Sequence, residues 1–230
     1  MRVDIRVYGI LDPAATPGAD LPTLARLAAH GGVTLLQYRD KSADGRLFVE
    51  RARGVLAALA GTNVPLLIND RVDVAIAVGA QGVHLGQDDI LPKDARDILG
   101  PTKIIGRTLN NETDIRAMVQ EPVDYGCVSG VFPTLHKDYP DPPMGIAGLA
   151  RLALLSREIA PDIPVGAIAG ITEVNAPQVI AAGADGVAVI GAIFNQSDPA
   201  GAARGLRAIV EEALFLRSRE KGLGAPLPIG

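Results

Sequence analysis

Three polar side chains of one parity follow an apolar run near residue 35. On an extended backbone Gln37, Arg39 and Lys41 point to the same side. Arginine offers a planar fork of donors and lysine a compact charge, so together they suit phosphate oxygens. The plainer alternative is a solvated strand end whose cations pair with nearby acids. We favour phosphate binding, because all three residues directly follow a buried-strand pattern.

Carboxylates follow the next two apolar runs. Asn69 and Asp70 end one run, and Asp89 comes just after the next. Mg²⁺ in proteins takes one or two carboxylates, several waters and substrate phosphate oxygens. We therefore predict that Asp70 and Asp89 hold a divalent cation. The alternative for Asp70 is the N-cap of the following helix. His84, inside the second run, is predicted to be a packed, hydrogen-bonded histidine.

Small residues end two apolar runs in the second half of the chain. Gly170 closes the turn after residues 165–168, and Ile190 and Gly191 end the last apolar run. Small residues leave backbone N–H groups accessible, which is typical of the phosphate sites of α/β barrels. We predict a second phosphate site there.

A long proline-rich loop separates these two regions. Residues 132–145 are too long and polar for a plain connection and contain Thr134 and Lys137. A hydroxyl and an ammonium group on such a loop predict a lid over a phosphorylated ligand. A solvated loop lysine is the alternative.

The elements that must position these residues alternate between strand and helix. Short apolar runs predict buried parallel strands, and segments with helical apolar spacing lie between them. The expected strands are residues 7–11, 33–37, 64–68, 82–85, 104–106, 125–129, 165–168 and 186–190. The expected helices include residues 21–29, 47–59, 147–159, 175–182 and one that begins at the capping pair Asp198-Pro199.

Eight strand–helix units predict an α/β fold, a single (β/α)₈ TIM barrel. A doubly wound open sheet is the rival. The matching segments 77–83 and 181–187, each a helix stop, a turn and a new strand, favour the repeated unit of a barrel. We expect residues 1–221 to form one domain and residues 222–230 a flexible C-terminal tail. The C-terminal ends of barrel strands share one rim, so the polar residues above converge there.

Composition excludes several classes of protein. The 230 residues are 48% hydrophobic, enough for one core, and a net charge of −4 without a basic stripe excludes nucleic acid as a partner. No run approaches the roughly 18 apolar residues of a membrane span. The single Cys127 excludes an internal disulfide, fits a cytoplasmic protein and is expected to be a buried thiol rather than a nucleophile. Small-molecule substrates are the expected partners, and a homo-oligomer stays open.

These segments resemble the thiamine phosphate synthase family from about residue 8 to about residue 209. Five segments stand in family order: LLQYRDK at 35–41, LLINDRVD at 66–73, GVHLGQDD at 82–89, VFPT at 131–134 with Lys137, and AGADGV at 182–187. The resemblance implies a TIM-barrel transferase with Mg²⁺ as cofactor. Its reaction joins 4-amino-2-methyl-5-hydroxymethylpyrimidine diphosphate to hydroxyethylthiazole phosphate and releases pyrophosphate, with no protein nucleophile.

The resemblance also implies a role for each matched residue. The residues implied to bind the pyrimidine diphosphate are Gln37, Arg39, Lys41 and Asn69. The metal ligands are Asp70 and Asp89, rather than Asp88. The residues implied to bind the thiazole phosphate are Thr134, Gly170, Ile190 and Gly191. The catalytic cations, which neutralise the departing pyrophosphate, are Arg39, Lys41 and Lys137.

The chain departs from the family pattern at three places. Gly-Arg107-Thr108 stands where the family often has Gly-Val-Ser, so Thr108 keeps a hydroxyl for substrate while Arg107 adds a charge without an evident purpose. Ala167 and Ala169 add two methyls to a turn that in the family is usually Gly-Ile-Gly-Gly. Gly191 replaces a serine, and losing its hydroxyl–phosphate bond costs about 1–2 kcal/mol, which weakens thiazole phosphate binding roughly tenfold.

Two other functions stay open on the same residues. A thiazole tautomerase-like isomerase needs a proton-transfer residue, typically histidine, where this chain has Asn110. The retained Asp70, Asp89 and Lys137 also count against it. A non-catalytic thiazole phosphate-binding paralogue would bind ligand without turnover.

Overall fold

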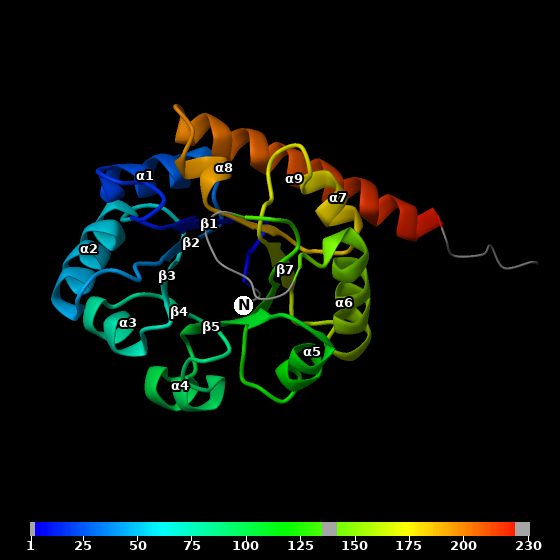
Figure 1. Cartoon of the computed structure of the whole chain (residues 1–230), viewed down its shortest axis with the longest axis horizontal. Helices are drawn as coiled ribbons and strands as arrows, with labels where there is room; N and C mark the ends of the chain where they lie inside the picture. Colours follow the sequence, from blue (N-terminus) through cyan, green and yellow to red (C-terminus); the bar gives the residue numbers. More distant parts are fainter. Residues whose placement is uncertain (1–2, 135–141, 224–230) are drawn as a thin grey trace, which may run out of the picture.

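Eight parallel strands close into a barrel in chain order within residues 3–134 and 142–223, the part of the chain that the computed structural model describes. The barrel closes where β1 pairs with β8 (Figure 1). The strands are β1 (Val7–Leu11), β2 (Leu35–Tyr38), β3 (Leu66–Asn69), β4 (Gly82–Leu85), β5 (Ile104–Leu109), β6 (Tyr125–Val128), β7 (Val165–Ile168) and β8 (Val187–Val189). Closure confirms the predicted TIM barrel and excludes the open sheet.

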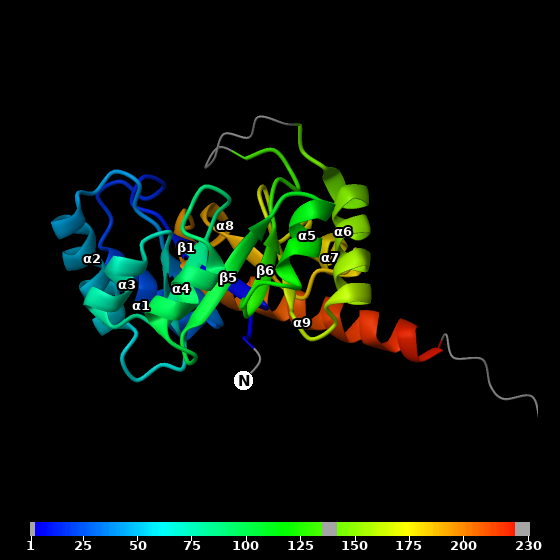
Figure 2. The ribbon, with the colours of Figure 1, turned by 90° about the horizontal axis from the view of Figure 1, so that it is seen from below.

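Helices surround the strands. They are α1 (Leu21–Gly31), α2 (Gly45–Ala58), α3 (Val72–Val78), α4 (Pro92–Leu99), α5 (Glu112–Met118), α6 (Gly145–Ile159), α7 (Ala176–Ala181), α8 (Gly191–Phe194) and α9 (Pro199–Leu223). In the side view of Figure 2, α4 and α5 flank β5. The predicted cap of the last helix is present, since the Asp198 carboxylate accepts the Gly201 N–H at 2.9 Å.

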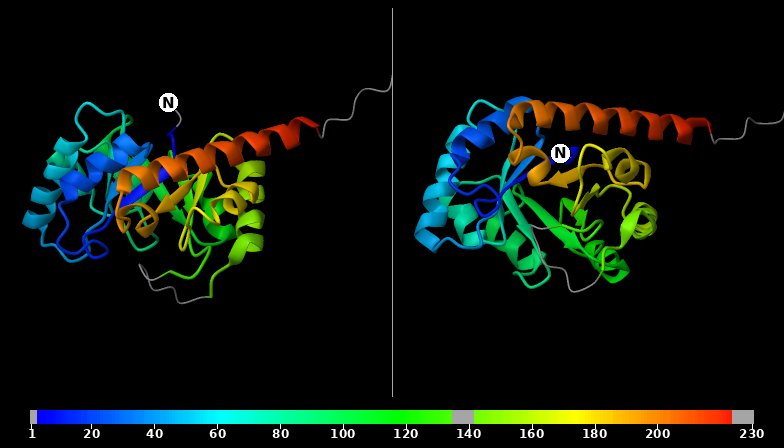
Figure 3. Two further views of the ribbon diagram at one scale, coloured as in Figure 1. Left: turned by 90° about the horizontal axis from the view of Figure 1, so that it is seen from above. Right: turned by 45° about the horizontal axis from the view of Figure 1, so that its top comes forward.

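The long helix α9 packs against α1 and α7 and runs past the barrel (Figure 3). It continues to Leu223, so the first two residues of the predicted tail are helical. Residues 224–230 lie outside the described part of the chain, and their predicted flexibility stays a prediction. No helix in the described ranges is both long and apolar enough to cross a membrane.

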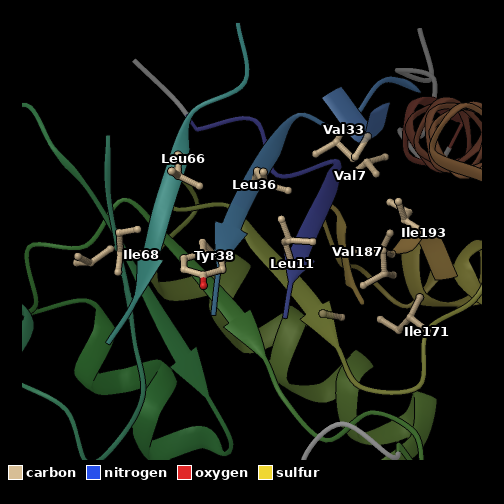
Figure 4. Packing of buried hydrophobic residues seen from close by; sticks show 14 of the residues in the cluster. Val7, Leu11, Val33, Leu36, Tyr38, Leu66, Ile68, Ile171, Val187 and Ile193 are labelled. Carbon is tan, nitrogen blue, oxygen red and sulfur yellow. The ribbon is translucent and has the colours of Figure 1, made fainter. Parts of the chain in front are cut away.

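Side chains alternate between two hydrophobic layers. On β2, Leu36 and Tyr38 point outward and pack under the helices, where Figure 4 shows them beside the outward residues of neighbouring strands. Leu35 belongs to a second cluster inside the barrel, together with Tyr8 and Tyr125. This alternation leaves the inward positions at the strand ends free for polar residues.

Five strands differ in their bounds from the sequence prediction: β2, β3, β5, β6 and β8. The second strand begins at Leu35 rather than residue 33, because the Val33 N–H completes the last turn of α1 by donating to the Ala28 carbonyl at 3.1 Å. The fifth strand runs on to Leu109 instead of ending at residue 106, because its ladder with β6 continues. Arg107 and Thr108 therefore lie on a strand and face opposite sides of the barrel wall.

Candidate active site

A cavity of about 840 Å³ opens at the C-terminal ends of the strands. Each strand contributes an inward residue: Tyr8, Gln37, Asn69, His84, Thr108, Cys127, Ile168 and Ala188, in strand order. The side formed by β2 to β5 is polar, whereas β6 to β8 supply mostly apolar side chains and accessible backbone. The cavity also brings together predicted residues of both halves of the chain: Gln37, Arg39, Asn69, Thr108, Thr134, Gly170, Ile190 and Gly191.

Arg39 lies on the cavity wall and is oriented by a buried carboxylate. Its guanidinium donates to Asp12, whose side chain is only 4% exposed. The Asp12 carboxylate also accepts the Ala14 N–H at 2.9 Å, so it is fixed from two sides. Sequence analysis missed Asp12, although it directly follows the first strand as the other polar residues follow theirs. Arg39 therefore both pairs with an acid and lines the cavity.

Lys41 and the two predicted metal ligands, Asp70 and Asp89, do not line the described cavity; they lie on the loops that follow β2, β3 and β4. Lys41 is 59% exposed and donates to Asp70, again a pair with a nearby acid. The Asp70 N–H donates to the His84 carbonyl at 2.9 Å, which anchors it between β3 and β4. Asp70 is not the N-cap of α3, because Arg71 occupies that position. Its backbone φ of +60° is one that aspartate tolerates.

Asp70 and Asp89 are close enough to influence each other's ionisation. Burial and the neighbouring Asp70 carboxyl raise the pKa of Asp89 above its usual range. The Asp89 carboxylate accepts the Gly86 N–H at 2.7 Å, which orients it. Two adjacent carboxyl groups, of which Asp89 has a raised pKa, fit a divalent cation that would neutralise both. Within the described residues no group of three or more acidic, histidine or cysteine side chains could hold a metal ion.

A chain of hydrogen bonds crosses the interior of the barrel. Gln37 donates to the Tyr8 hydroxyl, which shares a 2.8 Å hydrogen bond with the Tyr125 hydroxyl. Tyr125 in turn contacts His84 Nδ1 at 2.8 Å, and His84 Nε2 lies 3.0 Å from the Thr108 hydroxyl. Burial raises the pKa of both tyrosines, so they remain neutral. The chain joins two cavity-lining groups, Gln37 and Thr108, through His84 and through two tyrosines that gave no local sequence signal.

The predicted packed histidine is therefore also part of the cavity. His84 is 8% exposed and both of its ring nitrogens have hydrogen-bond partners. With a buried tyrosine on one nitrogen and a hydroxyl on the other, the ring is held in one orientation. It serves as a link between the core and Thr108.

The turn after β7 faces the loop after β6. Gly170 has φ +64°, and a Cβ there would lie 2.4 Å from the Pro133 carbonyl oxygen and 2.7 Å from Phe132 Cβ. The Phe132 N–H donates to the Ala169 carbonyl at 3.1 Å, which ties the two loops together. This contact sets Thr134 on the cavity wall beside the backbone of Gly170. Ala169 holds a φ of +91°, a strained value for a residue with a side chain.

Three further residues singled out in the sequence are Lys137, Cys127 and Arg107. Lys137, with the central part of the predicted lid, falls outside the described residues. Cys127 lines the cavity but is 2% exposed, and burial raises the pKa of its thiol to about 12, so it stays protonated at neutral pH. Arg107 is absent from the described cavity wall and faces the loop after β4 instead.

Comparisons with known proteins agree on one family. The family model described as thiamine monophosphate synthase matches residues 7–193. A thiamine-phosphate synthase of Agrobacterium fabrum is 50% identical over 216 residues, which covers 94% of this chain and 98% of the relative. One from Vibrio parahaemolyticus is 43% identical over 84% of this chain and 93% of its own length.

Solved structures agree as well. A thiamine phosphate pyrophosphorylase from Pyrococcus furiosus superposes with a TM-score of 0.81 at 33% identity, covering 93% of this chain and 98% of that one. A 3-hexulose-6-phosphate synthase, at 18% identity and a TM-score of 0.59, shares the fold alone. The match extends over the strands that build the cavity and the loops that carry its polar residues, and the chain therefore belongs to the thiamine monophosphate synthase family.

Proposed function

We propose that this protein condenses 4-amino-2-methyl-5-hydroxymethylpyrimidine diphosphate with hydroxyethylthiazole phosphate to give thiamine phosphate and pyrophosphate. The observation that carries the proposal is one cavity with two chemically different edges, each of which suits a phosphate group. Arg39 lines the cavity on the β2–β4 side, and Lys41, Asp70 and Asp89 lie on the loops that follow these strands. A glycine-containing backbone edge lies across from them at β7 and β8. A volume of about 840 Å³ accommodates two small heterocycles side by side.

The diphosphate would bind at the β2–β4 edge. Arg39, held by Asp12, and Lys41, beside Asp70, would contact its oxygens, with Gln37 and Asn69 on the inner wall toward the pyrimidine. Asp70 and Asp89 would hold Mg²⁺. When bound, that ion neutralises charge as the pyrophosphate departs.

The thiazole phosphate would bind at the opposite edge. Thr134 offers a hydroxyl, and the backbone of Gly170, Ile190 and Gly191 lines the cavity close to it. Gly191 has no side-chain hydroxyl, so at that position only the backbone N–H would contact the phosphate. Thr108 stands at the end of the interior hydrogen-bond chain and would contact the pyrimidine, between the two phosphate-binding edges.

Positioning and charge are sufficient for the reaction. The C–O bond of the pyrimidine methylene breaks with both electrons passing to pyrophosphate, whose charge Arg39 and Lys41 would balance. The methylene cation is stabilised by its own ring, and the thiazole nitrogen donates its lone pair to form the new C–N bond. No protein nucleophile is consumed, which agrees with a protonated Cys127. The role of Lys137 at the departing pyrophosphate stays a prediction.

The direct test is to mix both substrates with Mg²⁺ and measure thiamine phosphate. We expect product with the wild type, a loss of at least a hundredfold in Asp89→Ala, and near-normal turnover in Asp88→Ala. Asp88 is the matched control, because it is the exposed neighbour of the half-buried Asp89. Pure folded protein that forms no product would refute the proposal.

The same mixture separates the alternatives. Conversion of the carboxythiazole tautomer without pyrimidine would indicate an isomerase, and thiazole phosphate binding without turnover would indicate a non-catalytic paralogue. In the structure Asn110 lies just beyond β5, with its N–H on Asp114 at 2.7 Å, and an amide offers no proton-transfer group. Cytoplasmic location, the lack of a nucleic acid partner and the oligomeric state stay predictions.

A further inference from the structure

We propose that Arg107 and Gln87 are positioning residues that hold the loop after β4, residues 86–89, in the geometry in which Asp89 binds the divalent cation. The inference rests on the proposed function and assigns a purpose to an arginine that the family resemblance left unexplained. Neither side chain would touch substrate; both would act through the loop.

Arg107 reaches out of the barrel wall to the start of this loop. It is 8% exposed, and its Nη1 donates to the Gly86 carbonyl. Its Nη2 donates to Gln87 Oε1 at 3.0 Å, so one guanidinium donates hydrogen bonds to both the backbone and a side chain of the loop. Glu121 lies 3.6 Å from Nε and balances the charge. A compensated guanidinium that faces away from the cavity serves structure rather than phosphate binding.

Gln87 joins the same loop to β5 and α5. Its amide nitrogen donates to the Thr108 carbonyl at 2.9 Å and to Asp114 Oδ2 at 3.0 Å. Asp114 also accepts the Asn110 N–H at 2.7 Å, which connects the contact to the start of α5. The loop after β4 is thus joined to β5 and α5 by both the acceptor and the donor of one amide.

Gly86 passes this constraint on to the metal ligand. Its carbonyl is held by Arg107, and its N–H donates to Asp89 Oδ2 at 2.7 Å. A Cβ on Gly86 would lie 3.0 Å from the same carboxylate oxygen, so the two groups are in close contact. The position of Asp89 therefore depends on the peptide that Arg107 fixes. Groups that orient a metal ligand in this way typically change metal affinity by 10–100-fold when removed.

Direct binding of Mn²⁺ tests the inference without turnover. Mn²⁺ is titrated into the full-length protein, alone and with inorganic pyrophosphate, and free metal is measured by electron paramagnetic resonance. We expect Arg107→Met to raise the Mn²⁺ dissociation constant about tenfold. Arg107→Lys, which keeps the charge but lacks the fork, should recover only part of the affinity. Activity of Arg107→Met should return toward wild type as Mg²⁺ is raised, so that the loss appears in the metal requirement rather than in kcat.

The matched control is Arg96→Met. Arg96 is a partly buried arginine, with a side chain 18% exposed against 10% for Arg107. It binds the Gly100 and Pro122 carbonyls and Asp124 beside the opposite end of β5. It should leave the Mn²⁺ affinity unchanged. Should Arg107→Met fail to fold, the test uses Gln87→Ala, because Gln87 is exposed. We expect this variant to bind Mn²⁺ several-fold more weakly than the wild type.

The outcomes separate this inference from the proposed function. If the wild type binds Mn²⁺, Asp89→Ala abolishes binding and folded Arg107→Met binds as tightly as wild type, the positioning role is wrong while the metal site stands. Equal weakening in Arg96→Met would also overturn it, since the effect would then be general loss of packing. If Asp89→Ala binds metal as the wild type does, the metal site itself fails.

Discussion

The side chains at the bottom of the cavity are oriented by partners far away in the sequence. Tyr8 and Tyr125 are separated by 117 residues, yet their hydroxyls share a 2.8 Å hydrogen bond. The link runs on through His84 to Thr108, so a cavity-lining hydroxyl is oriented by the core. A buried polar group that loses its partner costs about 1–3 kcal/mol, which makes each member of the chain sensitive to substitution.

Tyr125→Phe tests whether this chain supports binding as well as stability. We expect a loss of about 1–3 kcal/mol in the free energy of unfolding, because Tyr8 and His84 each lose a buried partner. We also expect a roughly fivefold rise in KM for the pyrimidine diphosphate as Thr108 becomes less well oriented, which corresponds to about 1 kcal/mol. Denaturant unfolding and steady-state kinetics measure the two effects.

Tyr38→Phe is the matched control for that substitution. Tyr38 is equally buried and donates to Asp40 at 2.9 Å, but it faces the helices rather than the cavity. It should lower stability by about 1 kcal/mol and leave KM unchanged. A similar KM for both variants would show that the interior chain only stabilises the fold.

At the scale of elements, the loops after β6 and β7 form one unit. Gly170 permits the approach of Pro133 and Phe132, and the Phe132 N–H binds the Ala169 carbonyl. The loop after β4 is tied to β5 and α5 in a comparable way by Arg107 and Gln87. Neighbouring loops thus constrain one another on both of the proposed phosphate-binding sides of the rim.

Gly170→Ala should disrupt the first of these contacts. The added Cβ meets a positive φ and a carbonyl oxygen 2.4 Å away, so we expect a loss of about 3 kcal/mol or more and weaker thiazole phosphate binding. Gly79→Ala is the control, since its φ is +75° but nothing lies within 4 Å of a Cβ there. It should cost about 1 kcal/mol from backbone strain alone and leave binding intact. Equal stabilities would show that the loops yield without cost.

The whole molecule depends on closure of the sheet, because every strand contributes to the cavity wall. Pairing of β1 with β8 sets the first and last strands side by side, and α9 covers the join by packing on α1 and α7. Ligands that bind only this closed form stabilise it by mass action. The stability of the barrel and occupancy of its rim are therefore linked.

Mg²⁺ with pyrophosphate should raise the melting temperature. At a ligand concentration one hundred times the dissociation constant the gain is about 2.7 kcal/mol, or roughly 5–10 °C for a domain of this size. Asp89→Ala should lose most of the shift and Asp88→Ala should keep it, as measured by differential scanning fluorimetry. A shift that is the same in both variants would place the bound ion elsewhere.

Much of the fold and part of the site could be predicted from local pattern. Apolar runs of strand length, helical spacing between them and polar residues at the run ends are properties of adjacent residues, and they predicted the barrel and its functional rim. Gln37, Arg39, Asn69 and Thr108 do line the cavity. Asp12 directly follows β1, so it too is a polar residue at the end of an apolar run.

Other features were decided only by the tertiary structure. Local spacing does not predict three of the contacts at the site. They are the ion pair of Arg39 with Asp12, the hydrogen bond of Tyr8 with Tyr125, and the hydrogen bond of Arg107 to the loop after β4. Each depends on strand register and on which side of the barrel wall a residue faces, and a shift of one residue reverses that side. Periodicity along a chain specifies which elements form, whereas contacts between distant residues exist only once closure of the sheet has brought the elements together.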